Sequence, residues 1–232
     1  MNRLVITLLL SIVVSLCACA QAEEEAETYH NNYVATMMKE AEQGNAEAQT
    51  FLGIMYQQGI GVAKDETEAA KWYREAADQE DSQAASILGI MYADGLGVPQ
   101  DEEEALTWFR KGAISGLQKF SMQPILFAGG YEGAINAAES GNELAKTIIG
   151  KMYLTGSGVT QSDVEAVRWL TEGTKGFAAA GAQEALATLY EEGRGGLSKD
   201  KAEAIRLYRM AAEQTAANLE SSVRMVYESG PM

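Results

Sequence analysis

The stretch GNAEAQTFLGIMYQQGIGVAKDETEAAKWYREAA, from Gly44 to Ala77, decides the fold, because the chain repeats it. The next stretch, DSQAASILGIMYADGLGVPQDEEEALTWFRKGA, runs from Asp81 to Ala113 and restates the same pattern. The shared run LGIMY begins at position 52 and again at position 88, a step of 36 residues (88 − 52). A fixed step of this length is typical of stacked structural repeats. We therefore expect an elongated stack and not one globule, in which each repeat touches only the repeats before and after it.

Each unit has the pattern of two helices joined by a glycine-rich loop. In the first copy, apolar residues recur at three- and four-residue steps on both sides of the loop Gly59–Val62, as on the buried face of a helix. Asp65 and Glu68 have the spacing of a capping box at the start of the second helix. The same spacing recurs in the other well-formed copies, at Asp101 and Glu104, Ser162 and Glu165, and Asp200 and Glu203. The sequence thus predicts an all-α chain of helix–loop–helix repeats.

The repeats occupy residues 44–212, with four clear copies and one degenerate copy at 113–140. The glycine junctions on either side of the degenerate copy are only 25 residues apart (141 − 116), where 36 are expected. We predict two short helices there, Leu117–Phe127 and Tyr131–Ser140. The regular stack should bend at this point, because a shortened repeat cannot present the same surfaces to its neighbours.

Cap helices are predicted at both ends of the stack. Residues 21–43 comprise an acidic leader followed by a helix from Thr28 to Gln43, which takes the place of the second helix of a missing earlier copy. Residues 213–232 should form a C-terminal cap helix and tail, with Asn218–Tyr227 as the first helix of a sixth copy. Terminal repeats of a solenoid are usually atypical in this way.

Residues 1–20 have the pattern of a targeting segment. Arg3 precedes an apolar core that is short for a membrane span and typical of a secretory signal. Small-x-small cleavage fits a cut after Ala20 or after Ala22, whereas Leu16–Cys19 resembles a bacterial lipobox that would leave Cys19 as a lipidated first residue. We expect export to the periplasm, or alternatively an outer-membrane lipoprotein or a secreted chain. Contact with a membrane is expected only if Cys19 is lipidated.

Charge and composition argue against several kinds of chemistry. The chain has 33 acidic and 18 basic residues and a net charge of −15, which repels nucleic acid, so no nucleic-acid partner is expected. The two cysteines, Cys17 and Cys19, lie in the targeting segment, and His30 is the only histidine, expected as an exposed cap residue. The chain outside the targeting segment therefore lacks the cysteines and the second histidine that a transition-metal site or a nucleophile–base pair would use. We predict no catalytic residue, metal or cofactor, and a chain that is not an enzyme.

The unit A-Q/A-x-x-LG-x-M-Y-x-x-G-x-G-V-x-x-D-x-x-x-A-x-x-W-Y/F-x-x-A-A closely resembles the Sel-one-like repeat (SLR), a relative of the tetratricopeptide repeat. The resemblance implies a right-handed α-solenoid that acts as an adaptor and binds a protein or peptide on its concave side. Secreted bacterial members of the family include periplasmic regulators of sensor kinases, lipoproteins of polysaccharide export and host-interaction proteins. A cysteine-rich branch, linked to β-lactam binding, matches this chain poorly because the repeats here contain no cysteine.

By analogy with tetratricopeptide repeats, the first helix of each copy should line the inner curve. Residues between the positions of its apolar ridge would then face a groove. These residues are Glu47, Thr50, Ile54 and Gln57 in copy one, Gln83, Ser86, Ile90 and Ala93 in copy two, Leu144, Thr147, Lys151 and Leu154 in copy four, and Glu184, Thr188 and Glu191 in copy five. We hypothesise that Ile54 and Ile90 form the hydrophobic part of a partner site. The alternative is a solvated groove with binding elsewhere.

Two classes of function remain. The leading one is a non-catalytic interaction scaffold in the bacterial cell envelope. The second is an envelope hydrolase or cell-wall-ligand binder that uses scattered carboxylates. Only a pocket with clustered acids of shifted pKa would favour the second class.

Overall fold

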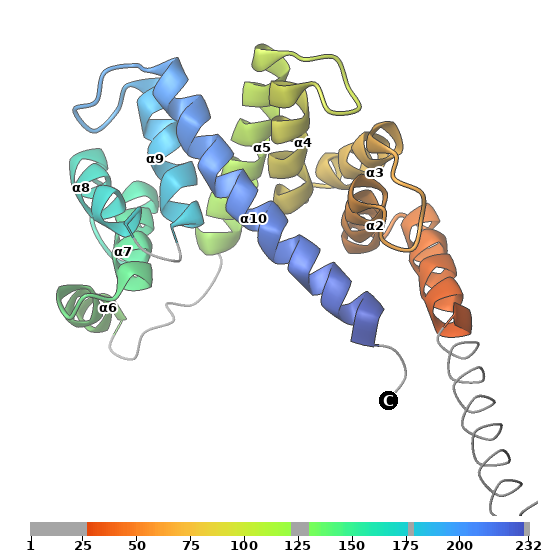
Figure 1. The fold of residues 1–232 in the computed structure, drawn as a ribbon. Coiled ribbons are helices and arrows are strands. Elements are labelled where there is room, and N and C mark those ends of the chain that lie inside the picture. Colours follow the sequence, from red (N-terminus) through yellow and green to blue (C-terminus); the bar gives the residue numbers. More distant parts are fainter. Residues whose placement is uncertain (1–26, 122–129, 176–178, 230–232) are drawn as a thin grey trace, which may run out of the picture.

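The computed structural model describes residues 27–121, 130–175 and 179–229, and within these ranges every regular element is a helix (Figure 1). The all-α solenoid predicted from the repeats is confirmed. The predicted targeting segment, residues 1–20, lies outside the described residues. Within the described ranges, no helix is both long and apolar enough to cross a membrane.

The helices form hairpins that follow the repeats. A first helix covers residues 27–42, close to the predicted N-terminal cap at Thr28–Gln43. The remaining helices, in chain order, are α2 (Ala46–Gln58), α3 (Glu66–Asp78), α4 (Ser82–Asp94), α5 (Glu102–Ser121), α6 (Gly130–Glu139), α7 (Glu143–Thr155), α8 (Asp163–Gly173), α9 (Ala180–Glu192) and α10 (Lys201–Ser229). Copies one, two, four and five are the hairpins α2–α3, α4–α5, α7–α8 and α9–α10.

The predicted capping residues start the second helices. The Asp65 carboxylate accepts hydrogen bonds from the backbone N–H groups of Thr67 and Glu68, at 2.9 and 3.0 Å. Asp101, Ser162 and Asp200 accept equivalent bonds in the other copies. Such a cap satisfies backbone donors that the helix itself leaves unpaired. The spacing seen in the sequence therefore sets where each second helix begins.

A glycine in the middle of the first helix lets the two helices of a copy approach closely. A Cβ built on Gly53 would lie 2.6 Å from the ring of Tyr73 in α3, and one on Gly150 would lie 2.6 Å from Leu170 in α8. Tyr73 and Leu170 are fully buried at these contacts, as are the periodic methionines Met55, Met91 and Met152. The glycine at this place in copies one and four thus allows close packing of the two helices of the hairpin.

The degenerate third copy differs from the prediction. α5 continues without a break to Ser121, so the helix predicted to begin separately at Leu117 is the end of α5. Residues 122–127 of that prediction lie outside the described residues. The second predicted helix, Tyr131–Ser140, corresponds to α6. The run GAISGLQKFS has no loop residues after Gly116 that would end α5 earlier, which explains the continuation.

The C-terminal region also differs, because no separate cap helix follows copy five. α10 is one helix of 29 residues, and the predicted helix Asn218–Tyr227 is its distal half. The intervening run AAEQTAAN contains neither glycine nor proline and is rich in alanine, so nothing in it ends a helix.

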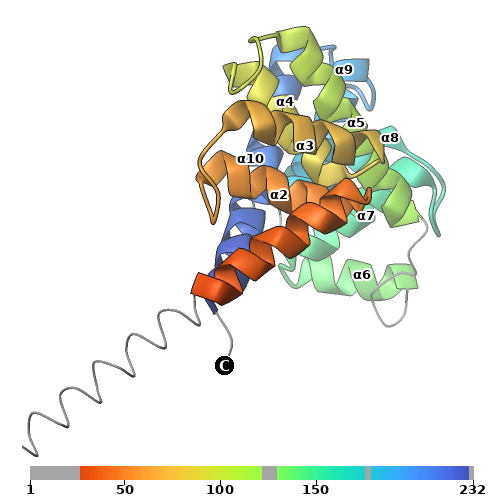
Figure 2. The ribbon, with the colours of Figure 1, turned by 90° about the vertical axis from the view of Figure 1, so that its right-hand side faces the viewer.

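This long helix brings together copies that are far apart in sequence. α10 contacts α4, α5 and α2, and α5 contacts α7 and α9 (Figures 1 and 2). Phe109 of α5 stacks on Tyr208 of α10, with ring centroids 5.8 Å apart. The expectation that each hairpin touches only its neighbours in the chain is therefore wrong. Copy five therefore packs beside copy two.

Candidate functional site

Three of the residues predicted to face the groove lie instead inside their own hairpins. Thr50, Ser86 and Thr147 are at most 4% exposed. Their hydroxyls donate hydrogen bonds of 3.0, 2.9 and 3.2 Å to the carbonyl four residues earlier. Ser86 Oγ lies 2.6 Å from the place of a Cβ on Gly112, and Thr147 Oγ1 lies 2.6 Å from that on Gly173. The prediction for these three positions is corrected: they pack against the second helix.

The hypothesised isoleucine pair is largely covered. Ile54 is 2% exposed and Ile90 is partly buried. One turn after Ile54, Gln57 accepts a hydrogen bond of 2.8 Å from the hydroxyl of Tyr73. Burial, and after it the charge of Glu220 in α10, raises the pKa of Tyr73 well above its ordinary value. The distal half of α10 thus lies close to this part of α2, and Ile54 is not open to a partner in this structure.

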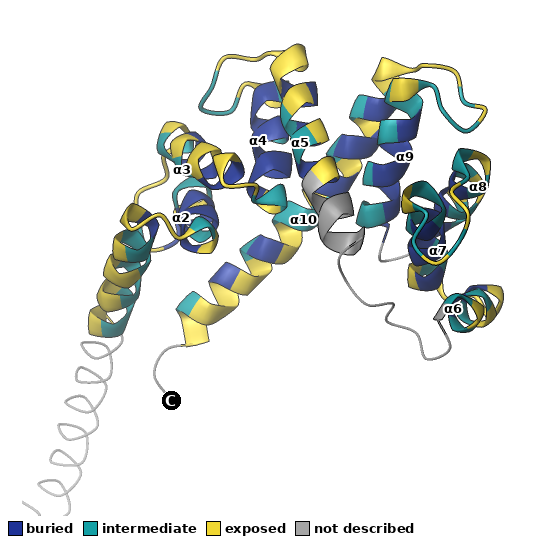
Figure 3. Ribbon diagram, turned by 180° about the vertical axis from the view of Figure 1, so that it is seen from behind, coloured by how far each residue is buried: buried dark blue, intermediate teal, exposed yellow. Residues whose placement is uncertain are grey.

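The distal half of α10 is amphipathic. Leu219 and Val223 are 9% and 0% exposed and Tyr227 is partly buried, at steps of four residues along one face. The opposite face is open to solvent, with Met225 68% exposed (Figure 3). This four-residue spacing is that of a helix that lays one apolar stripe on another surface.

The tip of α10 reaches the N-terminal helix. Tyr227 stacks on His30 with ring centroids 4.3 Å apart, and it meets Tyr33 edge-on at 6.1 Å. The ring of Tyr227 also lies 2.8 Å from the place of a Cβ on Gly61. His30, expected as an exposed cap residue, is therefore partly buried against α10. These contacts join the two ends of the solenoid.

Further predicted residues meet where copies four and five face each other. Lys151 Nζ of α7 lies 2.9 Å from the place of a Cβ on Gly181 of α9. Burial lowers the pKa of Lys151 and raises the pKa of Glu184, and each charge opposes the shift of the other. Thr188 shares a hydrogen bond of 2.9 Å with the hydroxyl of Tyr208. Lys151 and Glu184 thus interact between packed helices, and Thr188 lies one turn further along α9, where its hydroxyl donates a hydrogen bond of 3.2 Å to the Glu184 carbonyl. We call these three residues the polar cluster.

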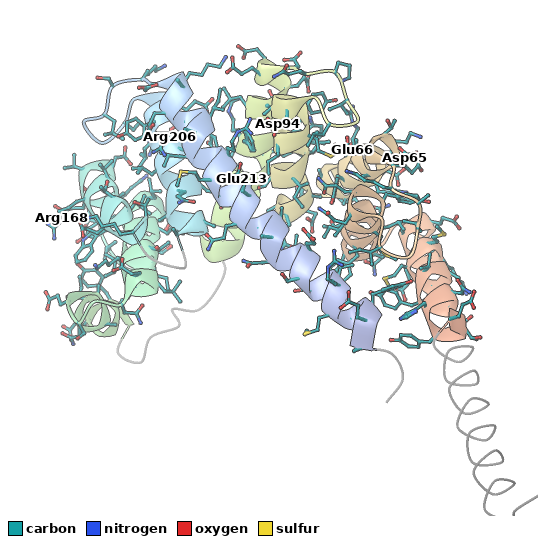
Figure 4. The ribbon with its side chains drawn as sticks, viewed as in Figure 1. Asp65, Glu66, Asp94, Arg168, Arg206 and Glu213 are labelled. Atoms are coloured by element: carbon teal, nitrogen blue, oxygen red, sulfur yellow. The ribbon has the colours of Figure 1, made fainter. Side chains whose placement is uncertain are left out.

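Ion pairs tie copy two to copy five around this cluster. Arg110 of α5 pairs with the predicted groove residue Glu191, and Lys201 pairs with Glu103. Arg209 of α10 lies 2.8 Å from the carboxylate of Asp94, which is labelled in Figure 4 at the end of α4. These groups are partly exposed, so each pair contributes about 1 kcal/mol or less. Their shared effect is to hold copy five against copy two.

The structure bears on the hydrolase alternative through its carboxylates. Among the described residues, Glu184 is the one carboxyl whose pKa is raised, and its charged neighbour is Lys151, not a second acid. No group of three or more His, Cys, Asp or Glu in the described ranges could hold a metal ion. The paired acids that hydrolysis of this kind uses are not assembled in the described part of the chain.

The first-turn positions of the first helices remain open. Glu47, Gln83 and Leu144 are all exposed, whereas Ala93 and Leu154, near the far ends of their helices, are partly buried. Glu47 also borders an apolar groove that the sequence did not predict. This groove has a volume of about 270 Å³ and lies between helix 27–42, α2 and the tip of α10.

The periodic residues Tyr33, Met37 and Phe51 line that groove together with Val226. From the sequence, each of the first three resembles an ordinary residue of an apolar ridge. Their shared exposure depends on how α10 meets helix 27–42, which periodicity alone does not specify. The groove therefore could be found only from the folded chain.

Comparison with known proteins identifies the repeat. The Sel1 repeat family model matches residues 46–81, 82–117, 143–174 and 180–215, and so passes over the shortened third copy. No curated protein matches the chain.

Among solved structures, a Sel1 repeat protein from Oxalobacter formigenes is 28% identical, with 82% of each chain covered and a TM-score of 0.39. A protective antigen of uropathogenic Escherichia coli with an SLR fold is 28% identical over 84% of this chain, with a TM-score of 0.35. The match covers 47% of that antigen, so this chain spans about half its length. Since the family model covers more than half of the chain, the protein belongs to the Sel1 repeat family.

Proposed function

We propose that this protein is a non-catalytic adaptor of the bacterial cell envelope that binds a protein or peptide on the inner surface of its solenoid. Sel1 repeats generally mediate protein–protein interaction and typically form non-catalytic scaffolds. The export of this chain is inferred from residues 1–20. Its partner class is inferred from the chemistry of the inner surface.

The observation that carries the proposal is the packing of α10. We call the surface of copies one and two that its distal half covers the seat of α10. The inner surface of copies one and two already holds an amphipathic helix, which buries Leu219 and Val223 there. A surface that accepts one apolar helical stripe has the shape and chemistry for helix-in-groove recognition. In the first turns of α2, α4 and α7, the single residues Glu47, Gln83 and Leu144 are exposed and are available to a second chain.

Site-specific photo-crosslinking in the source cells tests the adaptor role. A photoreactive phenylalanine analogue is placed in turn at Glu47, Gln83 and Leu144, the exposed first-turn positions. Matched controls place it at Lys71, Thr107 and Arg168, which are exposed at equivalent positions of the second helices; Arg168 points outward from α8 (Figure 4).

We expect discrete adducts of the same mass from at least two inner positions and none of that mass from the outer ones. Equal adduct patterns from the two sets would contradict binding on the inner surface. Mass spectrometry of the mature N-terminus tests the envelope part: a free residue after Ala20 or Ala22, or a lipid on Cys19, supports export. An intact Met1 in the cytoplasmic fraction would contradict it.

A further inference from the structure

The apolar groove at the N-terminal end of the solenoid has a floor and walls from three separate elements. Tyr33 and Met37 come from helix 27–42, Phe51 from α2 and Val226 from the tip of α10. The three inner residues are partly buried and pack on the main core, whereas Val226 is 39% exposed. A contiguous apolar surface of this kind, built from rigid helices, is a candidate for binding another chain.

The rim of this groove is acidic. Glu40 and Glu47 border it, and none of its described lining residues is basic. Burial raises the pKa of Tyr33, and the charges of Tyr29 and then of Glu40 add to that rise; Tyr33 and Glu40 both line the groove. The whole chain adds a net charge of −15. The electrostatic potential at the groove therefore favours a cation.

We propose that this groove binds a basic amphipathic segment of another protein, with an apolar side chain on Phe51 and Val226 and flanking Lys or Arg against Glu40 and Glu47. The inference rests on the proposed adaptor function and names its partner chemistry. Small-molecule pockets usually measure roughly 300–1,000 Å³, so about 270 Å³ suits one or two side chains of a peptide.

The chain's own leader is a poor occupant. Residues 21–26 carry Glu23, Glu24 and Glu25 and no cation, so they repel the same rim. A second copy of the chain would also bring its net negative charge to the groove. A cationic partner is the occupant that the charges favour.

The probe is the fluorescent synthetic peptide AKKLLKKFAKK, titrated into the purified mature chain and followed by anisotropy. Its controls are AEELLEEFAEE, which reverses the charge, and AKKSSKKSAKK, which keeps the charge and removes the apolar side chains. We expect the first peptide to bind at least about tenfold more tightly than either control. If AKKSSKKSAKK bound as tightly as AKKLLKKFAKK, the binding would be explained by charge attraction alone, and the proposal would be overturned.

A matched pair of variants locates the binding. Val226→Lys places a cation in the groove, and Met225→Lys makes the same charge change on the neighbouring residue, which is 68% exposed and lies outside the groove. We expect Val226→Lys to weaken binding about tenfold or more and Met225→Lys less than about twofold. Equal effects of the two variants would place the peptide elsewhere and contradict the proposal.

A second pair tests the rim without touching apolar packing. Glu40→Gln with Glu47→Gln should weaken binding several-fold and reduce its dependence on salt. Glu132→Gln with Glu139→Gln removes the same charge from α6 and should leave the affinity and its dependence on salt unchanged.

Sedimentation of the chain without peptide tests whether a second copy occupies the groove. Dimers that are lost on Val226→Lys would show that it does and would overturn the proposal. Gln83 and Leu144 lie outside the groove. If the groove fails to bind the peptide but crosslinks from these two positions persist, the proposed adaptor function still holds.

Discussion

Tyr227, near the end of α10, stacks on His30 in the first described helix, with ring centroids 4.3 Å apart and planes inclined by 19°. The two residues are 197 positions apart in the chain (227 − 30). Through this contact the last helix closes the solenoid onto its beginning. The inner surface of copies one and two is consequently a helix seat that the chain itself fills.

The buried stripe of α10 should hold its distal half in place. Val223 is fully buried there, so Val223→Ala removes apolar contacts and leaves a cavity, at a cost of about 2 kcal/mol. Hydrogen exchange of the amides in residues 216–229 measures this local stability. The expected result is a loss of protection confined to that part of α10.

Ser222→Ala is the control for this change, because Ser222 is exposed on the neighbouring position and its hydroxyl donates only to its own helix. It should alter protection by less than about 0.5 kcal/mol. Equal losses in the two variants would mean that the distal half of α10 is not docked on the first two copies.

The glycine at the centre of the first helix in copies one, two and four should tolerate no side chain. Gly53→Ala would put a methyl group 2.6 Å from the ring of Tyr73. Overpacking of this kind costs about 1–3 kcal/mol, which outweighs the gain of about 1 kcal/mol in helix propensity. Urea unfolding should show a lower free energy of unfolding for Gly53→Ala. A stabilised variant would mean that α2 and α3 are less closely packed.

The polar cluster of copies four and five predicts strong coupling between Lys151 and Glu184. Removing one member leaves the other charge in a desolvated site, whereas removing both leaves none. Each charge opposes the burial shift of the other, so the effects of Lys151→Met and Glu184→Gln on the free energy of unfolding should not add. The double variant should be more stable than the sum of the two single effects predicts, by about 0.5–3 kcal/mol. Simple additivity in this double-mutant cycle would argue against their interaction.

Glu184 also predicts a pH dependence of stability. Burial raises its pKa in the folded chain above the ordinary value of 4.5, so the folded state holds this proton more tightly than the unfolded state. The contribution is favourable below pH 4.5 and is lost as the pH rises through the folded-state pKa.

The pH profile of urea unfolding measures this contribution. The native chain should lose stability relative to Glu184→Gln as the pH rises from about 4 to about 7. Glu139→Gln, an exposed site on α6, should run parallel to the native chain. A Glu184→Gln profile that also runs parallel would show that the carboxyl titrates normally in the fold.

The helical hairpins could be predicted because their determinants are local. Asp65 caps α3 within three residues of itself, and Gly53 meets Tyr73 inside the same hairpin. Signals of this kind lie in one 36-residue unit and recur in the others. The capping positions and the all-α class were therefore readable from the sequence.

The inner surface was harder to predict, for two physical reasons. Successive residues of a helix point about 100° apart, so an error in the assumed rotation of the first helix about its axis changes which residues face the groove. The rotation assumed by analogy with tetratricopeptide repeats placed Thr50, Ser86 and Thr147 in the groove, whereas they lie in the hairpin interface. The path of α10 depends on contacts between residues far apart in the chain, such as Phe109 with Tyr208. No periodicity within one unit encodes such distant contacts.

The distance between the two ends of the solenoid tests the closure by α10 most directly. Spin labels on Asn32→Cys and Glu228→Cys, both exposed and close in sequence to the stacked pair His30 and Tyr227, are measured by double electron–electron resonance in the mature chain. The closed solenoid predicts one narrow peak at the short end of the measurable range, which broadens on Val223→Ala. A broad distribution at long distances in the native chain would contradict it.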